Sequence, residues 1–244
     1  INQASSQFIF KRFLVPMSHL FSIFIPNFFG NQATYNYWGR GDYIETVASV
    51  GLIPCFFTLL AIGYGPKNHK NLIGFFVATT IISVLLTINW YGSRLFFALG
   101  IPVLSSDVPS RIFVLTTFSL SILAGIGFNS WITSKKKFSL TLIKTYLLFI
   151  LVVLLTLAVL IFLKFPCRIG VVNNCFLVAL RNSVFESVIF CLFTIVFFLK
   201  FNRNLSGIIK IIPFATLFLI IISGLYNSNK FLHFSKKETI LPVN

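Results

Sequence analysis

Long apolar runs separated by short polar gaps dominate the chain. Six of these runs are long enough, or nearly so, to cross about 30 Å of hydrocarbon as helices rising about 1.5 Å per residue. The predicted spans are 47–64, 72–90, 112–131, 140–163, 183–199 and 208–226. The fifth span is short and carries Glu186 near its start. The pattern predicts an all-α fold, a polytopic transmembrane helix bundle of about six spans.

The first 45 residues follow a different pattern. From Met17 to Phe28, apolar residues recur at the spacing of one helix face, and polar residues lie off that face. The apolar set is Met17, Leu20, Phe21, Phe24, Ile25 and Phe28, and the polar set is Ser18, His19, Ser22 and Asn27. This spacing favours a helix lying in the outer membrane interface. A short re-entrant segment or a true span over 13–29 is the competing interpretation.

These patterns divide the chain into three parts. We expect residues 1–45 to form an extracytoplasmic loop with the interfacial helix, and residues 46–229 to form the six-span bundle. Residues 230–244 would begin an extracytoplasmic C-terminal segment. The sequence starts at Ile1, without an initiator Met or a signal segment, so we expect both ends to lie inside a longer protein.

The composition supports a lipid environment. Hydrophobic residues make up 57% of the chain and charged residues only 10%, against about 25% charged in soluble domains. The net charge of +15 would suggest nucleic acid in a soluble protein. Here the basic residues lie in short gaps between apolar runs. We therefore predict contact with anionic lipids of the bilayer and no nucleic-acid partner.

The basic residues also predict an orientation. Those in the short gaps after the first, third and fifth spans are Lys67, Lys70, Lys135, Lys136, Lys137, Lys144, Lys200, Arg203 and Lys210. Because short basic loops stay in the cytoplasm, both ends of this chain are predicted to be extracytoplasmic in a multi-pass protein of the cell membrane. Lys164, Arg168 and Arg181, in a predicted outer loop, oppose this orientation.

Charged residues gather near the predicted outer ends of the spans. The candidates for an outer polar site are Arg40, Asp42, Glu45, Arg94, Asp107, Arg111 and Glu186. Guanidinium groups bind phosphate oxygens, and carboxylates act as general bases or hold metals. Headgroup contacts, helix caps and ion pairs are the alternative roles. For Glu186, inside an apolar run, a structural pair with an Arg is the leading interpretation.

The sequence contains few other chemical signals. It has no Gly-rich phosphate loop, HExxH motif, nucleophile elbow or Cys/His cluster, so no catalytic or metal residue is assigned. Cys167 and Cys175 share the predicted outer loop between the fourth and fifth spans. Outside the cell they could form a disulfide, because disulfides persist there. Two reduced thiols are the alternative.

Several short motifs stand out along the chain. They are Ile25-Pro26-Asn27-Phe28-Phe29-Gly30, Asn36-Tyr37-Trp38-Gly39, Asp42-Tyr43-Ile44-Glu45-Thr46, Val50-Gly51-Leu52-Ile53-Pro54, Ile101-Pro102-Val103-Leu104, Val108-Pro109-Ser110-Arg111, Leu123-Ala124-Gly125-Ile126-Gly127 and the ending Ser235-Lys236-Lys237-Glu238-Thr239-Ile240-Leu241-Pro242. Together these motifs resemble those of the YfhO-like bacterial membrane proteins. The resemblance covers roughly residues 20–130 and the tail. In the last three spans only the hydrophobicity is similar.

Such proteins are similar to GT-C glycosyltransferases. The resemblance implies a membrane segment of an enzyme that moves a sugar from a polyprenyl-phosphate carrier to a cell-envelope acceptor, and it leaves room for a divalent metal as cofactor. The catalytic carboxylate of that superfamily would lie upstream of this chain, so no residue here inherits the role. Glu45 and Arg111 lie within the matching motifs. The alternatives are a transporter or flippase for a lipid-linked sugar, and a structural membrane domain without catalysis.

Overall fold

The computed structural model describes residues 13–101, 108–133, 144, 146–148, 150–151, 175–200 and 210–231. Within these residues the regular structure is helical, apart from an isolated parallel bridge between Val15 and Ile88. The elements are η1 (Met17–Leu20), α2 (Phe21–Phe24), α3 (Tyr43–Thr46), α4 (Leu52–Tyr64), η2 (Lys67–His69), α5 (Lys70–Thr87), α6 (Tyr91–Ala98), η3 (Pro109–Ile112), α7 (Phe113–Thr133), α9 (Cys175–Leu199) and α10 (Ile212–Phe231).

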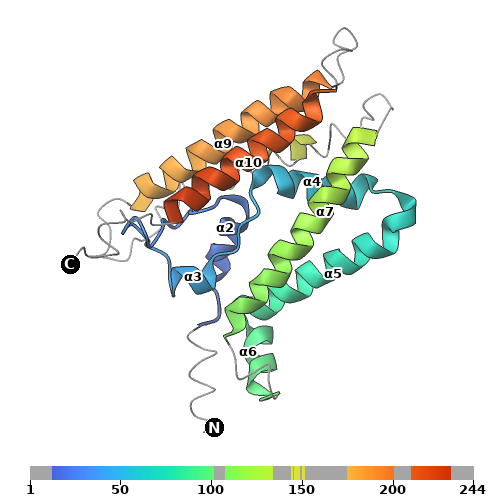
Figure 1. Ribbon diagram of the computed structural model, residues 1–244. Helices are drawn as coiled ribbons and strands as arrows, with labels where there is room; N and C mark the ends of the chain where they lie inside the picture. The colour runs from blue at the N-terminus through green and yellow to red at the C-terminus, as the bar shows by residue number, and fades with distance from the viewer. Residues whose placement is uncertain are drawn as a thin grey trace, which may run out of the picture.

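Four helical segments are long and apolar enough to cross a membrane. They are Lys67–Thr87, Pro109–Thr133, Cys175–Leu199 and Ile212–Lys230. They correspond to the predicted second, third, fifth and sixth spans. Most of the predicted fourth span, 140–163, lies outside the described residues. The helices pack in the order α5, α7, α4, α9, α10, and α9 and α10 lie antiparallel and side by side (Figure 1).

The predicted first span is shorter than expected. Its helix, α4, has 13 residues and is only about 20 Å long. Residues 47–51 are not helical. Gly51 has φ of 91°, in the left-handed region, and the N–H groups of Val50 and Gly51 both donate to the carbonyl of Ile23 at 3.0 Å. Because these two N–H groups donate to the N-terminal segment and not to a preceding helical turn, the helix begins only at Leu52.

The predicted fifth span is longer than expected. The sequence pattern placed its start at Ser183, but α9 begins at Cys175 and has 25 residues. Arg181 and Asn182 therefore lie within the helix and not in an outer loop. Glu186 lies near the middle of α9 and not near its start. The sequence pattern missed the start of this helix because its first turns contain polar residues. Asn182 lies within the helix although it is polar, because its side chain is buried and hydrogen-bonded to the N-terminal segment.

The predicted interfacial helix is two short pieces, η1 and α2, followed by a turn. The two predicted faces do not separate by burial. Ile25 and Phe28 of the apolar set are buried, and so are His19, Ser22 and Asn27 of the polar set, whereas Met17 is 61% exposed. The polar groups point inward because they have partners there. The Ser22 hydroxyl donates to the carbonyl of His19 at 2.6 Å, and the His19 ring accepts from the N–H of Arg40 at 3.1 Å.

The core near α4 is aromatic and closely packed. Phe56 and Phe57 of α4 meet Phe193 of α9 at ring-centroid distances of 5.4 Å. On the other side of α4, the carbonyl of Phe57 lies directly against Gly127 of α7. The Thr58 hydroxyl donates to the carbonyl of Leu120 at 3.1 Å. Small residues on α7 thus let two helix backbones approach closely, as is typical of membrane helices.

Candidate functional site

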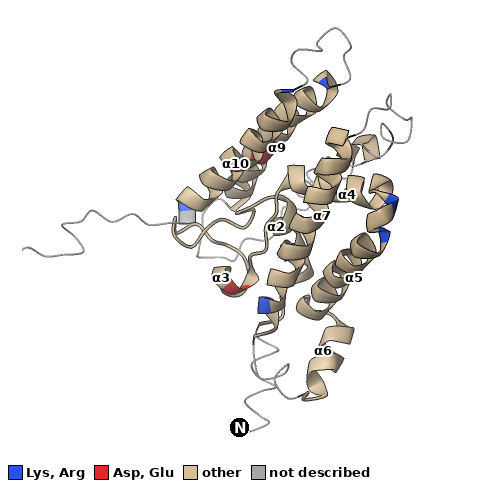
Figure 2. Cartoon of the chain, turned by 45° about the vertical axis from the view of Figure 1, so that its right-hand side comes forward, with Lys and Arg blue, Asp and Glu red and all other residues tan. Residues whose placement is uncertain are grey.

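A buried carboxylate lies in the middle of α9. Glu186 is only 3% exposed, although neighbouring residues in this helix are mostly apolar. Figure 2 places the acidic residues of the described chain at α3 and in the middle of α9. A carboxylate inside a candidate membrane span is expensive unless it is bonded or faces a cavity. Its surroundings are therefore the first place to look for function.

Two side chains of α10 hold this carboxylate. The Ser223 hydroxyl lies 2.9 and 3.1 Å from the two carboxylate oxygens of Glu186. The side-chain amide of Asn227 donates to Oε1 at 2.8 Å. Ser223 and Asn227 are four residues apart, so they share one face of α10. The α9–α10 pair is thus joined by a polar contact at membrane depth.

The N-terminal segment completes the network through Asn27. Its side-chain amide donates to Oδ1 of Asn227 at 3.1 Å, and its backbone carbonyl accepts from the Asn182 side chain at 2.6 Å. The hydroxyl of Tyr43 and the side-chain amide of Asn31 donate to its Oδ1. Asn27 has φ of 57°, a left-handed conformation that Asn tolerates better than most residues. The local turn and the network therefore both favour Asn at this position.

The hydrogen bonds in this network run in one direction. Tyr43 donates to Asn27, Asn27 donates to Asn227, and Asn227 donates to Glu186. Burial raises the pKa of Tyr43 to about 12, with a smaller contribution from Tyr37, so its hydroxyl keeps its proton. An ionised carboxylate is a pure acceptor, which suits the end of such a chain. The carboxyl group of Glu186 ends this chain as an acceptor, for the Asn227 amide and the Ser223 hydroxyl.

A positive charge lies near the C-terminal end of α10. The Lys230 ammonium is 3.4 Å from Oδ1 of Asn182 and lies 3.9 Å from the centre of the Tyr226 ring. It also interacts electrostatically with Glu186. Ser223, Asn227 and Lys230 are spaced four and three residues apart, so all three lie along one face of α10.

Two adjoining cavities lie beside the network. A cavity of about 300 Å³ is lined by Glu186, Ser223 and Asn227 together with Ser49, Gly51 and Pro54. A second, of about 270 Å³, is lined by Asn27, Tyr43 and Asn227. Pro26, Ser49, Asn227 and Ser228 line both. Hydroxyl, amide and carboxylate groups from three parts of the chain therefore surround a volume large enough for a small polar group.

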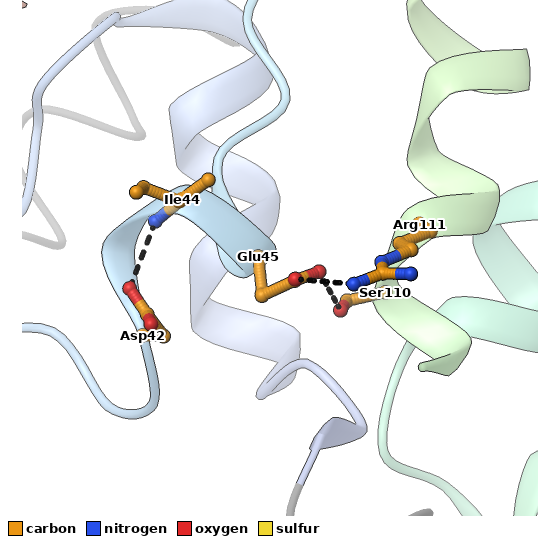
Figure 3. Close-up of polar contacts among 5 residues, drawn as sticks. All are labelled: Asp42, Ile44, Glu45, Ser110 and Arg111. Atoms are coloured by element: carbon orange, nitrogen blue, oxygen red, sulfur yellow. Dashed lines mark hydrogen bonds and ion pairs between the residues drawn. The ribbon is translucent and has the colours of Figure 1, made fainter. Parts of the chain in front are cut away.

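A separate polar contact involves Glu45 and Arg111 (Figure 3). Arg111 Nη2 lies 3.2 Å from Oε1 of Glu45, and the Ser110 hydroxyl lies 3.5 Å from Oε2. Arg111 is 58% exposed and Glu45 20%, so this pair is solvated. Asp42 is the N-cap of α3, where its side chain accepts from the N–H of Ile44 at 3.2 Å. Asp42 thus caps this short helix and not the first span.

The remaining candidate residues lie apart from the cavities. Arg94 is exposed and donates to the Asn89 side chain at 2.7 Å, and Arg40 is exposed. Arg181 is exposed on α9, whereas Glu186 is buried. Five residues along a helix turn about 140° around its axis, so these two cannot pair as the sequence suggested. Asp107 lies outside the described residues.

Sequence reasoning missed most of the network. Asn27, Asn182, Ser223, Asn227 and Lys230 were not singled out. A usable signal exists in the spacing, because Asn182 and Glu186 are four residues apart and the polar residues of α10 repeat at four and three. Polar residues at helical spacing on two apolar runs predict that the two runs face each other.

Among the described residues, no three His, Cys, Asp or Glu side chains are grouped so that they could hold a metal ion. Cys55 and Cys191 are free thiols, and Cys175 is disulfide-bonded. Cys167 lies outside the described residues. The pairing of Cys167 with Cys175 stays a prediction.

No protein-family model, curated protein or solved structure matches this chain. The similarity to YfhO-like proteins therefore rests on the short sequence motifs. The site must be interpreted from its own chemistry.

Proposed function

We propose that this chain is the membrane part of a protein that binds the headgroup of a lipid-linked sugar in the cavity beside Glu186. The reaction served would be GT-C-like transfer of the sugar from a polyprenyl-phosphate carrier to a cell-envelope acceptor. One observation carries the proposal. A buried carboxylate in the middle of α9 faces a cavity of about 300 Å³.

The lining groups suit a sugar. Sugar hydroxyls can donate to the oxygens of Glu186 and to the Ser223 hydroxyl oxygen, both of which line the cavity. Ser49 and Ser228 also line it and carry hydroxyls that can donate to a sugar. Ligand pockets usually measure about 300–1,000 Å³, so this cavity fits a single sugar ring better than a long chain.

The position of the cavity suits a lipid-linked ligand. Glu186 and Ser223 belong to α9 and α10, which are both long and apolar enough to cross a membrane. Asn182 contacts Asn27 about two helical turns inside α9. Non-helical backbone at membrane depth is tolerated where it is buried in protein or lines a cavity. On this interpretation the segment around Asn27 re-enters the bundle and supplies part of the binding site.

The proposed orientation keeps the short basic gaps in the cytoplasm and both chain ends outside. Its support is the positive-inside rule and the arrangement in Figure 1, where the start of α5, the end of α7 and the end of α9 lie toward one side. In intact cells lacking Cys55 and Cys191, an impermeant maleimide should label Gln32→Cys and spare Asn68→Cys. Labelling of Asn68→Cys alone would reverse the orientation.

Binding of a polyprenyl-phosphate hexose to the protein in nanodiscs tests the function. Titration followed by native mass spectrometry should show saturable binding, weakened about tenfold or more by Glu186→Gln, because a charge-assisted acceptor is lost. Glu45→Gln is the matched control. It makes the same chemical change at a solvated carboxylate and should leave the affinity unchanged.

Two results would contradict the proposal. Equal binding by the wild type and a well-folded Glu186→Gln variant would mean that the carboxylate only joins α9 to α10. Absence of saturable binding by the wild type would favour the structural membrane domain. If the lipid binds but a reconstituted protein moves it between leaflets without transferring its sugar, the flippase replaces the transferase.

A further inference from the structure

The polar strip between α9 and α10 has opposite charges at its two ends. Glu186 and Ser223 mark the inner end, and Lys230 marks the outer end. Ser223 and Lys230 are seven residues apart on one face of α10, which corresponds to about 10 Å along the helix. Asn227 lies between them and bonds Glu186. Asn227 lines both cavities, and Lys230 lies about one helical turn beyond it, past the residues that line them.

The Lys230 ammonium retains capacity to bind an anion. It has three N–H donors, and its hydrogen bond to Asn182 is long, at 3.4 Å. The ion pair found among the described residues joins Arg111 to Glu45 and does not involve Lys230. Tyr226 supports the ammonium from one side through a cation–π contact at 3.9 Å, and Phe185 stacks on Tyr226 at 3.8 Å. The charge is therefore positioned but not neutralised by a directly paired carboxylate.

The carboxyl end suits hydroxyls better than phosphate. A sugar hydroxyl can donate to the carboxyl oxygens of Glu186, whereas the oxygens of a phosphate are mainly acceptors and have little to donate there. Phosphate oxygens accept hydrogen bonds from an ammonium at the other end. The Glu186 end of the strip therefore suits the sugar, and the Lys230 end suits the phosphate.

We propose that the strip binds a sugar phosphate lengthwise, with the sugar in the Glu186 cavity and the phosphate at Lys230. This assignment rests on the proposed function and adds the direction of the ligand. Lys230 becomes the residue that selects a phosphate-bearing headgroup over a neutral glycolipid. The lipid chain attached to the phosphate then leaves the site near the outer end of α10.

Four probes separate the contributions of the two ends. They are a polyprenyl-phosphate hexose, the same polyprenyl phosphate without sugar, a neutral hexosyl diacylglycerol and a soluble hexose 1-phosphate. Lys230→Gln should weaken both phosphate-bearing lipids by about tenfold and leave the neutral glycolipid unchanged. Lys230→Arg should retain most of the affinity because it keeps the charge. Lys210→Gln, at the opposite end of the helix pair, is the matched control and should change none of the affinities.

The Glu186→Gln variant should show the reverse pattern. It should weaken both sugar-bearing lipids and leave the sugar-free polyprenyl phosphate unchanged. If this holds but Lys230→Gln spares the phosphate-bearing lipids, the direction of the ligand is wrong while the proposed function stands. If Glu186→Gln spares the sugar-bearing lipids, the proposed function itself fails. Equal affinity for soluble hexose 1-phosphate and the lipid would keep the direction but remove the lipid as the ligand source.

Discussion

The two sides of the bundle are joined by different chemistry. α4 and α7 meet over small residues, so that the Phe57 carbonyl lies against Gly127 and the Thr58 hydroxyl bonds the Leu120 carbonyl. α9 and α10 meet over polar side chains, with Ser223 and Asn227 bonded to Glu186. Cavities of about 300 and 270 Å³ lie beside this second contact.

The contrast separates the part that holds the bundle from the part that can bind a ligand. Close backbone packing gains dispersion energy over the whole contact and leaves little room for change. A buried polar network gives less net stability, because each bond replaces one to water or to another partner. This network lies within two candidate membrane spans and next to open volume, which is the basis of the proposed binding role. The predictions below test this division.

The largest effect is expected at Gly127. A Cβ added there would collide with the backbone carbonyl of Phe57, which belongs to α4 and cannot rotate away. Gly127→Ala should therefore destabilise the protein by about 3 kcal/mol, the upper part of the range for overpacking. Thermal unfolding in detergent measures this. Gly125→Ala, two residues away in the same helix with open space around its Cβ position, should be neutral or stabilising. Equal effects would mean that α4 and α7 are not closely packed.

A pH effect of similar size is expected from the N-terminal segment. Burial, together with the charge of Arg40, lowers the pKa of His19 to about 4 from its ordinary 6.5. Between these values the unfolded chain takes up a proton that the folded protein does not, so stability falls as pH drops from 6.5 to 4. The loss approaches about 3 kcal/mol below pH 4.

Unfolding measured at several pH values, with wild type and His19→Gln, isolates this contribution. Gln can still accept from the Arg40 N–H but does not titrate. The stability of the His19→Gln variant should change less between pH 6.5 and 4 than that of the wild type. If the stability of both proteins depends on pH in the same way, His19 is not buried as a neutral ring.

A smaller loss is expected at Asn27. Asn27→Ala removes the bonds to Asn227 and Tyr43 and places a less tolerant residue at φ of 57°. The expected loss is about 2 kcal/mol. Asn27→Gly removes the same bonds without the backbone strain, so it should recover about 1 kcal/mol. If Ala and Gly behave alike, the turn is not left-handed. If neither destabilises the protein, the network does not hold the N-terminal segment.

The smallest effect is expected at the Arg111–Glu45 pair. Because both side chains are partly solvated, their coupling energy should be below about 1 kcal/mol. A double-mutant cycle with Arg111→Ala and Glu45→Gln, followed by thermal unfolding, gives this energy directly. A coupling of several kcal/mol would place this pair in a dry environment and would make it a second candidate site.

The sequence predicted helix type and approximate position well where a run was uniformly apolar. The helices α5 and α7 begin and end within about three residues of the predicted spans. Predictions failed where polar residues have buried partners far along the chain. Asn182 looked like loop, and its bond to Asn27 is made 155 residues away. Periodicity depends only on local neighbours, so it placed the start of α9 too late and did not predict that His19, Ser22 and Asn27 are buried.

The candidate site was predictable only in part. Glu186 stands out in sequence because a carboxylate interrupts an apolar run, and it is the predicted candidate that lines a cavity among the described residues. Its partners Ser223 and Asn227 carry no charge and do not stand out by composition. Arg111 was a candidate for an ion pair or a phosphate contact, and the structure shows its bond to Glu45, 66 residues earlier in the chain. Such long-range pairs require the fold.

Labelling of a cysteine in the cavity wall tests the central claim most directly. Ser228 lines both cavities and is exposed, so Ser228→Cys should react with a small maleimide in a protein lacking Cys55 and Cys191. A polyprenyl-phosphate hexose at ten times its dissociation constant should slow this reaction about tenfold. An unchanged labelling rate at saturating lipid would show that the cavity beside Glu186 is not where the headgroup binds.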